Sequence, residues 1–281
     1  MTQGTTEFID VTTADKFLVE QWSNIASVEG EKKLVFGANV DRSGEAELKP
    51  GQILRRQHIS NLTATSKSAN TAISYETVAE SEDTVTVSNF YYVAFALEDV
   101  IAPMVKLSLL NAYMPKIGYG LNQQLDSDIA ALIDDNTITQ SVGTLATGLT
   151  YDNIVRADQY LNDDETPDEQ RAIIISHAEK ANFLKMDQFI NRDYQDIRTG
   201  LLGGVFNYPI FVTGNTNGSN TAGHDNVMLH PSAIMVIQQI KPAVGTDYDF
   251  DYKCVKVSGL TSYGMTINSQ FVNRAVWMKG A

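Results

Sequence analysis

The feature that most constrains the fold is an apolar stripe between residues 105 and 134. Apolar side chains recur at intervals of three or four residues, the spacing of one helix face: Leu107, Leu110, Met114, Ile117, Leu121, Leu125, Ile129 and Leu132. The stripe keeps its phase through Pro115, so we predict one helix, kinked at Pro115 and weakened at Gly118 and Gly120. It would span about 45 Å and act as a spine for the rest of the chain.

The segment before this helix indicates a long β-hairpin. We predict a strand over residues 52–62, which carries Arg55 and Arg56, and a return strand over residues 72–80. A Ser/Thr/Ala/Asn tract over residues 63–71 lies between them and is typical of an extended loop. An acidic turn, Ser-Glu-Asp at 81–83, should end the hairpin.

The stretch TVTVSNFYYVAFAL at residues 84–97 predicts a further strand. Its side chains alternate between two faces, and both faces are apolar. Tyr91, Val93, Phe95 and Leu97 form one face, and Phe90, Tyr92, Ala94 and Ala96 form the other. A strand that is apolar on both faces is normally buried on both, so we expect this one to be covered on each side.

The second half of the chain mixes helices and strands, so the fold class expected is α+β. We predict a helix over 150–162, a buried strand at Ala172–Ile175 with a helix from Ser176 to about Asn191, and a strand over 208–212. The Gly-rich segment 198–207 is expected to be irregular. VMLHPSAIMVIQQI at 227–240 predicts a strand, a turn and then a helix or strand, and the last fifty residues indicate β structure.

Charge and cysteine content exclude several classes of protein. The formal net charge of −13 argues against tight nucleic-acid binding, which needs clustered Lys and Arg. One cysteine, Cys254, leaves no intramolecular disulfide and no zinc site built from cysteines. The first residues carry no signal-peptide pattern, and no apolar run approaches the length of a membrane span. We therefore expect a soluble intracellular protein.

The Ser-His pair at 176–177 is the first candidate for catalysis. Ser176 and Glu179 match a capping box, in which each side chain bonds the other's backbone amide. That interpretation uses both polar groups and leaves His177 exposed in the first helical turn. A catalytic Ser–His pair would need facing side chains and a third group that orients the histidine, and the sequence contains no Gly-x-Ser-x-Gly elbow.

The remaining motifs predict no catalytic, cofactor or metal site. Asp247, Asp249 and Asp251 alternate as in a calcium loop, but the Gly and Glu that such a loop requires are absent. A solvated acidic edge is the preferred interpretation, with a weak cation site as the alternative. Gly118-Tyr-Gly120 lacks the third glycine of a dinucleotide motif, and the histidines have no ligand spacing. The four histidines are His58, His177, His224 and His230.

The order of these parts resembles the major capsid proteins of tailed bacteriophages over nearly the whole chain. Four stretches carry the resemblance: FLVEQWSNI, TVTVSNFYYVAFALEDV, LNQQLDSDIAALID and VMLHPSAIMVI. It implies an N-terminal arm at 1–50, an extended loop at 51–83 lying over a neighbouring subunit, and an axial domain at 146–255. It also implies a peripheral domain that holds the spine helix and is formed by 84–145 with the last strand, 256–281.

The resemblance further implies a structural, non-enzymatic protein without cofactors. Such a protein self-assembles into hexamers and pentamers of an icosahedral shell around double-stranded DNA, in the host bacterial cytoplasm. A scaffolding protein, a portal and a cement protein are the implied partners, and a scaffold segment removed before maturation is an alternative to a separate scaffold. The expected intersubunit residues are Arg55, Arg56, Lys67 and His177. A solvated hairpin face is the alternative for the arginines.

Two other functions are weighed against this one. The first is an α/β enzyme of unknown reaction, with a site near His177 and the loop 214–226. The second is a phage decoration protein or adhesin, which would form compact trimers or monomers and not rings.

Overall fold

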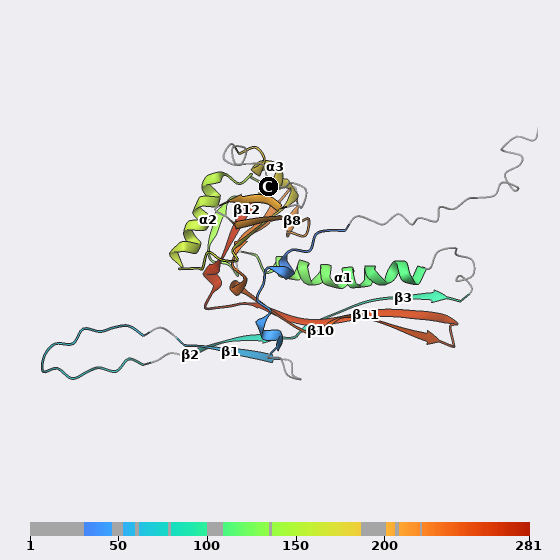
Figure 1. Ribbon diagram of the computed structural model, residues 1–281, viewed down its shortest axis with the longest axis horizontal. Coiled ribbons are helices and arrows are strands. Elements are labelled where there is room, and N and C mark those ends of the chain that lie inside the picture. The colour runs from blue at the N-terminus through green and yellow to red at the C-terminus, as the bar shows by residue number, and fades with distance from the viewer. Residues whose placement is uncertain are drawn as a thin grey trace, which may run out of the picture.

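The computed structural model describes residues 31–46, 53–59, 62–77, 80–99, 109–134, 137–186, 201–205, 208–219 and 221–281. These residues form three parts: a projecting hairpin, an elongated sheet beneath a long helix, and a lobe of helices on a larger sheet (Figure 1). The chain is thus a mixture of helices and sheets, as predicted. No helix in these ranges is long and apolar enough to cross a membrane.

The elongated sheet has the strand order β10-β11-β3 and is antiparallel throughout. Its strands are β3 (Asn89–Glu98), β10 (Ile234–Asp249) and β11 (Cys254–Ile267). Helix α1 (Leu109–Ala131) packs on one face, where Ile117 and Leu121 form a small core with Val257. Gly259 lies directly under the helix, because a Cβ there would come within 2.5 Å of Ile117.

The lobe is built on a seven-stranded sheet of order β4-β12-β9-β5-β7-β6, with β8 beside β9. The strands are β4 (Ser141–Gly143), β5 (Ala172–Ile175), β6 (Leu201–Val205), β7 (Tyr208–Val212), β8 (Gly218–Ser219), β9 (Gly223–Leu229) and β12 (Ala275–Gly280). Helix α2 (Tyr151–Asp163) covers one face, and helix α3 (His177–Phe183) follows β5. The four residues of β5 are fully buried, as its apolar run predicts.

The two faces of this sheet bury separate cores. Ile173 and Ile175 of β5 face α2, whereas Ile174 faces the end of α1 and Phe36 of the segment 31–46. A buried arginine, Arg171, closes the lobe beside β5: its guanidinium bonds the Asp158 carboxylate at 2.9 Å and the Tyr208 hydroxyl at 3.0 Å. Burial of Tyr208, together with the Asp158 charge, raises its pKa to about 12.

The segment 31–46 contains two short 3-10 helices, η2 (Phe36–Ala38) and η3 (Ser43–Ala46). It fastens α1 to the lobe, because the Gly37 amide donates to Asp126 at 2.9 Å and the Thr213 hydroxyl donates to the Lys33 carbonyl at 2.6 Å. The rest of the predicted arm, 1–30 and 47–50, lies outside the described residues.

The hairpin differs from its prediction in register. It consists of β1 (Ile53–Ile59) and β2 (Glu80–Thr86), paired so that Arg55 lies opposite Thr84. The predicted return strand over 72–80 is therefore wrong, since the described residues up to 77 pair with no strand, and the predicted turn at 81–83 lies inside β2. Two residues, Val87 and Ser88, separate β2 from β3.

Further boundaries also differ from prediction. Helix α1 ends at Ala131, three residues before the predicted end at 134, and its predicted start at residues 105–108 lies outside the described residues. Helix α3 ends at Phe183 and not near 191. The Gly-rich segment expected to be irregular contains strand β6.

Sheet membership corrects the predicted grouping of the last strands. β11 pairs with β3, whereas β12 pairs with β9 and β4 in the sheet of the lobe. Conversely, β10 lies within the predicted axial range 146–255 but pairs with β11 in the elongated sheet. Both corrections arise because η7 (Val272–Arg274) and the turn at η6 (Pro231–Ala233) redirect the chain between the two sheets.

Candidate intersubunit surface

The hairpin carries apolar side chains that lack a core of their own. Its loop, residues 62–77, projects away from the body of the molecule (Figure 1). Leu62, Ile73 and Tyr75 are 68%, 63% and 92% exposed. Within the loop, Glu76 accepts bonds from the Thr63 amide and hydroxyl at 3.0 and 3.2 Å, so the two limbs are held together only lightly. Side chains of this kind are normally covered when a partner is bound.

The structure separates the two arginines that the sequence placed together. Arg55 is largely exposed and pairs with Glu82 across the hairpin at 3.1 Å. Arg56 points inward and bonds Asp41 at 3.0 Å and the Ser43 hydroxyl at 2.9 Å. The pKa of Asp41 lies below its ordinary value: burial alone would raise it, but the hydrogen bonds from Ser43 and Arg56 have the larger combined effect. Arg56 therefore fastens the hairpin to its own chain.

Lys67 and His177 lie far apart, at the loop and on the lobe. Lys67 is exposed in the loop 62–77, and it and Glu76 are the only charged residues there. His177 is exposed in the first turn of α3, close to Gly214. The structure thus brings none of the four predicted contact residues into one cluster, apart from the neighbours Arg55 and Arg56.

A buried hydrogen-bonded pair at the base of the hairpin was missed by sequence reasoning. The His58 Nε2 lies 2.7 Å from the Asp83 carboxylate, and both side chains are buried. Asp83 also accepts the Ser269 amide at 3.1 Å, which connects the hairpin to the segment between β11 and β12. Phe271 contacts the His58 ring edge-on. The sequence held one indication that His58 is buried: it alternates with Leu54 and Arg56 and so lies on the same face of the strand.

The predicted two-sided cover of β3 is wrong for this single chain. Tyr91 and Phe95 pack against α1, as the alternation requires. On the opposite face Phe90 is 56% and Tyr92 76% exposed, and the register places Leu260 of β11, 44% exposed, beside Tyr92. An apolar sheet face is therefore open to solvent next to the edge of the sheet.

The acidic hairpin tip between β10 and β11 acts as a turn. Asp249 accepts the backbone amides of Asp251 and Tyr252, and its carboxylate also bonds Lys256. The bond from Lys256 lowers the pKa of Asp249. Within the described ranges, no group of three or more His, Cys, Asp or Glu side chains is placed to hold a metal ion.

The Ser-His stretch forms half of the predicted capping box. The Ser176 hydroxyl accepts the Glu179 amide at 3.2 Å and is buried. Glu179 does not reach back, because the Ser176 amide donates to Asn226 at 2.7 Å, while the Glu179 carboxylate accepts the Leu149 amide at 3.1 Å. Ser176 is thus used as a cap, and His177 points to solvent.

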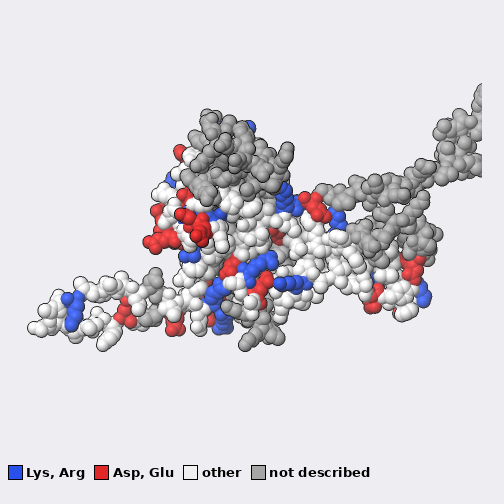
Figure 2. Space-filling view, viewed as in Figure 1, with Lys and Arg blue, Asp and Glu red and all other residues white. Residues whose placement is uncertain are grey.

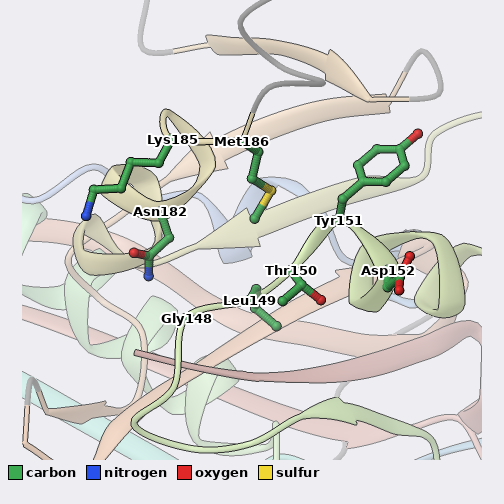
Figure 3. Close-up of a pocket in the computed structure, with 8 residues that line it drawn as sticks. All are labelled: Gly148, Leu149, Thr150, Tyr151, Asp152, Asn182, Lys185 and Met186. Carbon is green, nitrogen blue, oxygen red and sulfur yellow. The ribbon is translucent and has the colours of Figure 1, made fainter.

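An open pocket of about 450 Å³ lies between the start of α2 and the end of α3 (Figure 3). It is lined by residues 148–152 and by Asn182, Lys185 and Met186. The Asn182 amide nitrogen already donates to Glu179 at 3.3 Å. Among the described residues, its lining includes no group of three His, Cys, Asp or Glu side chains that could hold a metal ion, and we assign no ligand to it.

Comparison with known proteins finds relatives by structure only. No protein-family model and no curated protein matches the sequence. A solved structure from Mycobacterium phage Che8 is 20% identical, with a TM-score of 0.81 over 94% of this chain and 97% of that chain. The capsid structure of the cyanophage P-SCSP1u is 14% identical, with a TM-score of 0.76 over 96% and 94% of the two chains.

The head structure of Helicobacter pylori bacteriophage KHP40 is also similar. It is 10% identical, with a TM-score of 0.75 over 99% of both chains. Identities this low establish the fold alone, and in each case the match covers at least 94% of this chain. The chain therefore has the fold of a tailed-phage major capsid protein.

Proposed function

We propose that this chain is the major capsid protein of a tailed bacteriophage, which assembles into the hexamers and pentamers of an icosahedral shell around double-stranded DNA. The observation that carries the proposal is the projecting hairpin. Its loop exposes Leu62, Ile73 and Tyr75 far from any core of its own chain. A loop of this kind gains burial only against another molecule, and the fold is that of chains that form phage heads.

The charge distribution agrees with a shell that encloses DNA without binding it tightly. The net charge is −13, and on the face in Figure 2 basic and acidic side chains intermingle without a continuous basic surface. The loop at the left of that view carries few charges, which suits an apolar contact between proteins. We infer a structural role without catalysis and a location in the capsid, assembled in the host bacterial cytoplasm.

The parts of the molecule receive corresponding assignments. We assign residues 31–46 to the arm, β1, β2 and their loop to the extended loop over a neighbouring subunit, and α1 with the elongated sheet to the peripheral domain. The lobe with the seven-stranded sheet is the axial domain near the capsomer centre. Lys67 and Arg55 then face a neighbouring subunit, and His177 faces a neighbour around the capsomer axis. A scaffolding protein, a portal and possible cement proteins complete the set of partners.

The test is electron microscopy of the expressed chain, alone and with a scaffolding protein. Rings of five or six subunits and closed shells are expected. A chain that stays monomeric under all these conditions would contradict the proposal. A uniform population of compact trimers would favour a decoration protein instead.

The loop has its own test. Replacement of residues 63–71 by Gly/Ser of equal length should leave the melting temperature unchanged, because these side chains contact no core, and should abolish shell assembly. A deletion of the same residues separates the effect of length from that of sequence. If shells form normally from both variants, the loop makes no essential intersubunit contact.

A further inference from the structure

In the part of the chain that the structure describes, strand β3 is an unpaired edge of the elongated sheet. Among the described residues β3 pairs only with β11, so every second backbone amide and carbonyl of Asn89–Glu98 faces away from the sheet. The strand carries neither proline nor a charge before Glu98. Its free side chains are exposed too, with Tyr92 at 76%. Edges of this kind are templates for pairing with another strand.

The opposite edge of the same sheet is protected. β10 contains Pro242, which donates no hydrogen bond, and its pairing with β11 is irregular between Gln238 and Ala243. Asp247 and Asp249 follow near its end. Proline, irregular pairing and charge are the devices by which proteins block edge pairing. Because β10 has these features and β3 lacks them, we infer that the β3 edge is the one available for pairing with another strand.

The chain also contains a strand-like segment without a partner. Residues 71–77 form an extended trace in Figure 1 and pair with no strand among the described residues, and Ile73, Tyr75 and Thr77 stand at alternate positions along them. This limb and β3 lie toward opposite ends of the molecule, so the limb cannot reach the β3 edge of its own chain (Figure 1). Only a second copy can bring the two together.

We propose that the limb 71–77 of one copy adds as a strand to the free edge of β3 in a neighbouring copy. This inference rests on the proposed function, in which the hairpin lies over a neighbour, and it specifies the contact as main-chain pairing. Side chains of Ile73 and Tyr75 then extend the open apolar face around Tyr92.

Charge selects the antiparallel direction. Lys67 precedes the limb and Glu76 ends it, while Glu98 ends β3. Antiparallel pairing brings the start of the limb, with Lys67, toward Glu98 and places Glu76 near the uncharged start of β3. Parallel pairing would set Glu76 beside Glu98, and like charges at neighbouring positions destabilise a sheet.

Disulfide trapping tests the pairing. In a Cys254→Ala background, cysteines are placed singly at positions 71 to 77, each combined with Ala94→Cys. A matched set replaces Ala94→Cys by Ser258→Cys, the residue opposite Ala94 one strand further in. A bridge requires Cα atoms within about 7 Å, whereas an added strand lies about 9.6 Å from β11. Oxidised particles should therefore show intermolecular links to position 94 only, at alternate limb positions.

Hydrogen exchange on the unaltered chain gives a second measurement. The number of protected amides in residues 89–98 should about double when free subunits assemble into particles, since the outward amides become bonded. A charge swap tests the antiparallel direction of pairing. Lys67→Glu should weaken assembly, and Lys67→Glu combined with Glu98→Lys should restore it.

Each outcome decides. Links to Ser258→Cys would mean that the limb lies across the sheet face, which overturns strand addition but keeps the hairpin on the neighbour. Strand addition is also overturned if particles form with no link to either position and no gain in β3 protection. The proposed function itself is refuted if neither the variants nor the unaltered chain form particles. If the cysteine variants do not assemble, the exchange measurement alone decides.

Discussion

The buried pair at the base of the hairpin provides the sharpest test of how the projecting element is held. Asp83 binds two donors, the His58 ring nitrogen at 2.7 Å and the Ser269 amide at 3.1 Å. Asp83→Ala removes the carboxylate that accepts from both donors. The matched control is Glu82→Ala, one residue earlier in β2, whose carboxylate is 46% exposed and bonds the exposed Arg55.

The expected loss follows from the number of donors left without a partner. A buried donor without an acceptor costs about 1–3 kcal/mol. The His58 nitrogen bears this cost in full, whereas the Ser269 amide, near the surface, regains part of it from water. We expect Asp83→Ala to lower the free energy of unfolding by about 2–4 kcal/mol. Glu82→Ala should lower it by less than about 0.5 kcal/mol, as for other exposed pairs.

The assay is thermal unfolding with hydrogen exchange over residues 53–59. For a chain of this size the melting temperature falls by roughly 2–4 °C per kcal/mol, so Asp83→Ala should melt at least about 4 °C lower than the unaltered chain. If the hairpin opens separately from the body, exchange in β1 should rise while the main transition stays. Equal behaviour of Asp83→Ala and Glu82→Ala in both measurements would refute the anchoring role.

The same pair predicts a dependence on pH. Burial raises the pKa of the Asp83 carboxyl, but bonds from Ser269 and His58 outweigh it and hold the net pKa below its ordinary value of 3.8. A depressed pKa means that the contribution of Asp83 is complete above about pH 4–5 and is lost as the pH falls through the lowered value. Asp83→Asn should therefore lose less stability between about pH 5 and pH 2 than the unaltered chain does.

Two core substitutions test the other parts of the fold. Arg171→Ala should destabilise the lobe by about 2–3 kcal/mol, because it removes a fully buried side chain that bonds the partly exposed Asp158 carboxylate and the Tyr208 hydroxyl. Arg156→Ala on the exposed side of α2 should change stability by less than about 0.5 kcal/mol; chemical denaturation measures both. Gly259→Val should cost about 1–3 kcal/mol, since its side chain would collide with Ile117 under α1. Gly245→Ala should melt like the unaltered chain, because its Cβ would come no closer than 4.0 Å to its nearest neighbour, the Ser258 carbonyl oxygen.

Local patterns predicted the elements whose neighbours lie close in sequence. The three-to-four spacing from Met114 to Ile129 identified α1 through Pro115, and the four apolar residues of β5 identified a strand buried on both faces. Ser176 was assigned as a cap, and its hydroxyl does accept the Glu179 amide. These features depend on periodicity and on contacts within one turn, both of which a single sequence contains.

Pairing between distant segments could not be predicted in the same way. The return strand of the hairpin starts at Glu80, because the partner of Ile59 is set by the register of β1 and β2 and not by the apolar alternation of residues 72–77. His58 looked like an isolated histidine because its partner, Asp83, lies across that unknown register. The assignment of β12 to the lobe depends on its pairing with β9, about fifty residues earlier in the chain.

The error on β3 is of a different kind, because the sequence pattern and the single chain disagree for a physical reason. Phe90 and Tyr92 alternate with Tyr91 and Phe95 as in a strand buried on both faces, yet one face is open to solvent. Leaving large aromatic side chains in water forgoes about 25 cal/mol for each Å² that could be buried. Since β3 has no polar alternation to suit an exposed face, its sequence matches an environment that one copy does not provide. Under the proposed function, the pattern of β3 describes the assembled state, and the open face of this strand is where a neighbouring subunit would bind.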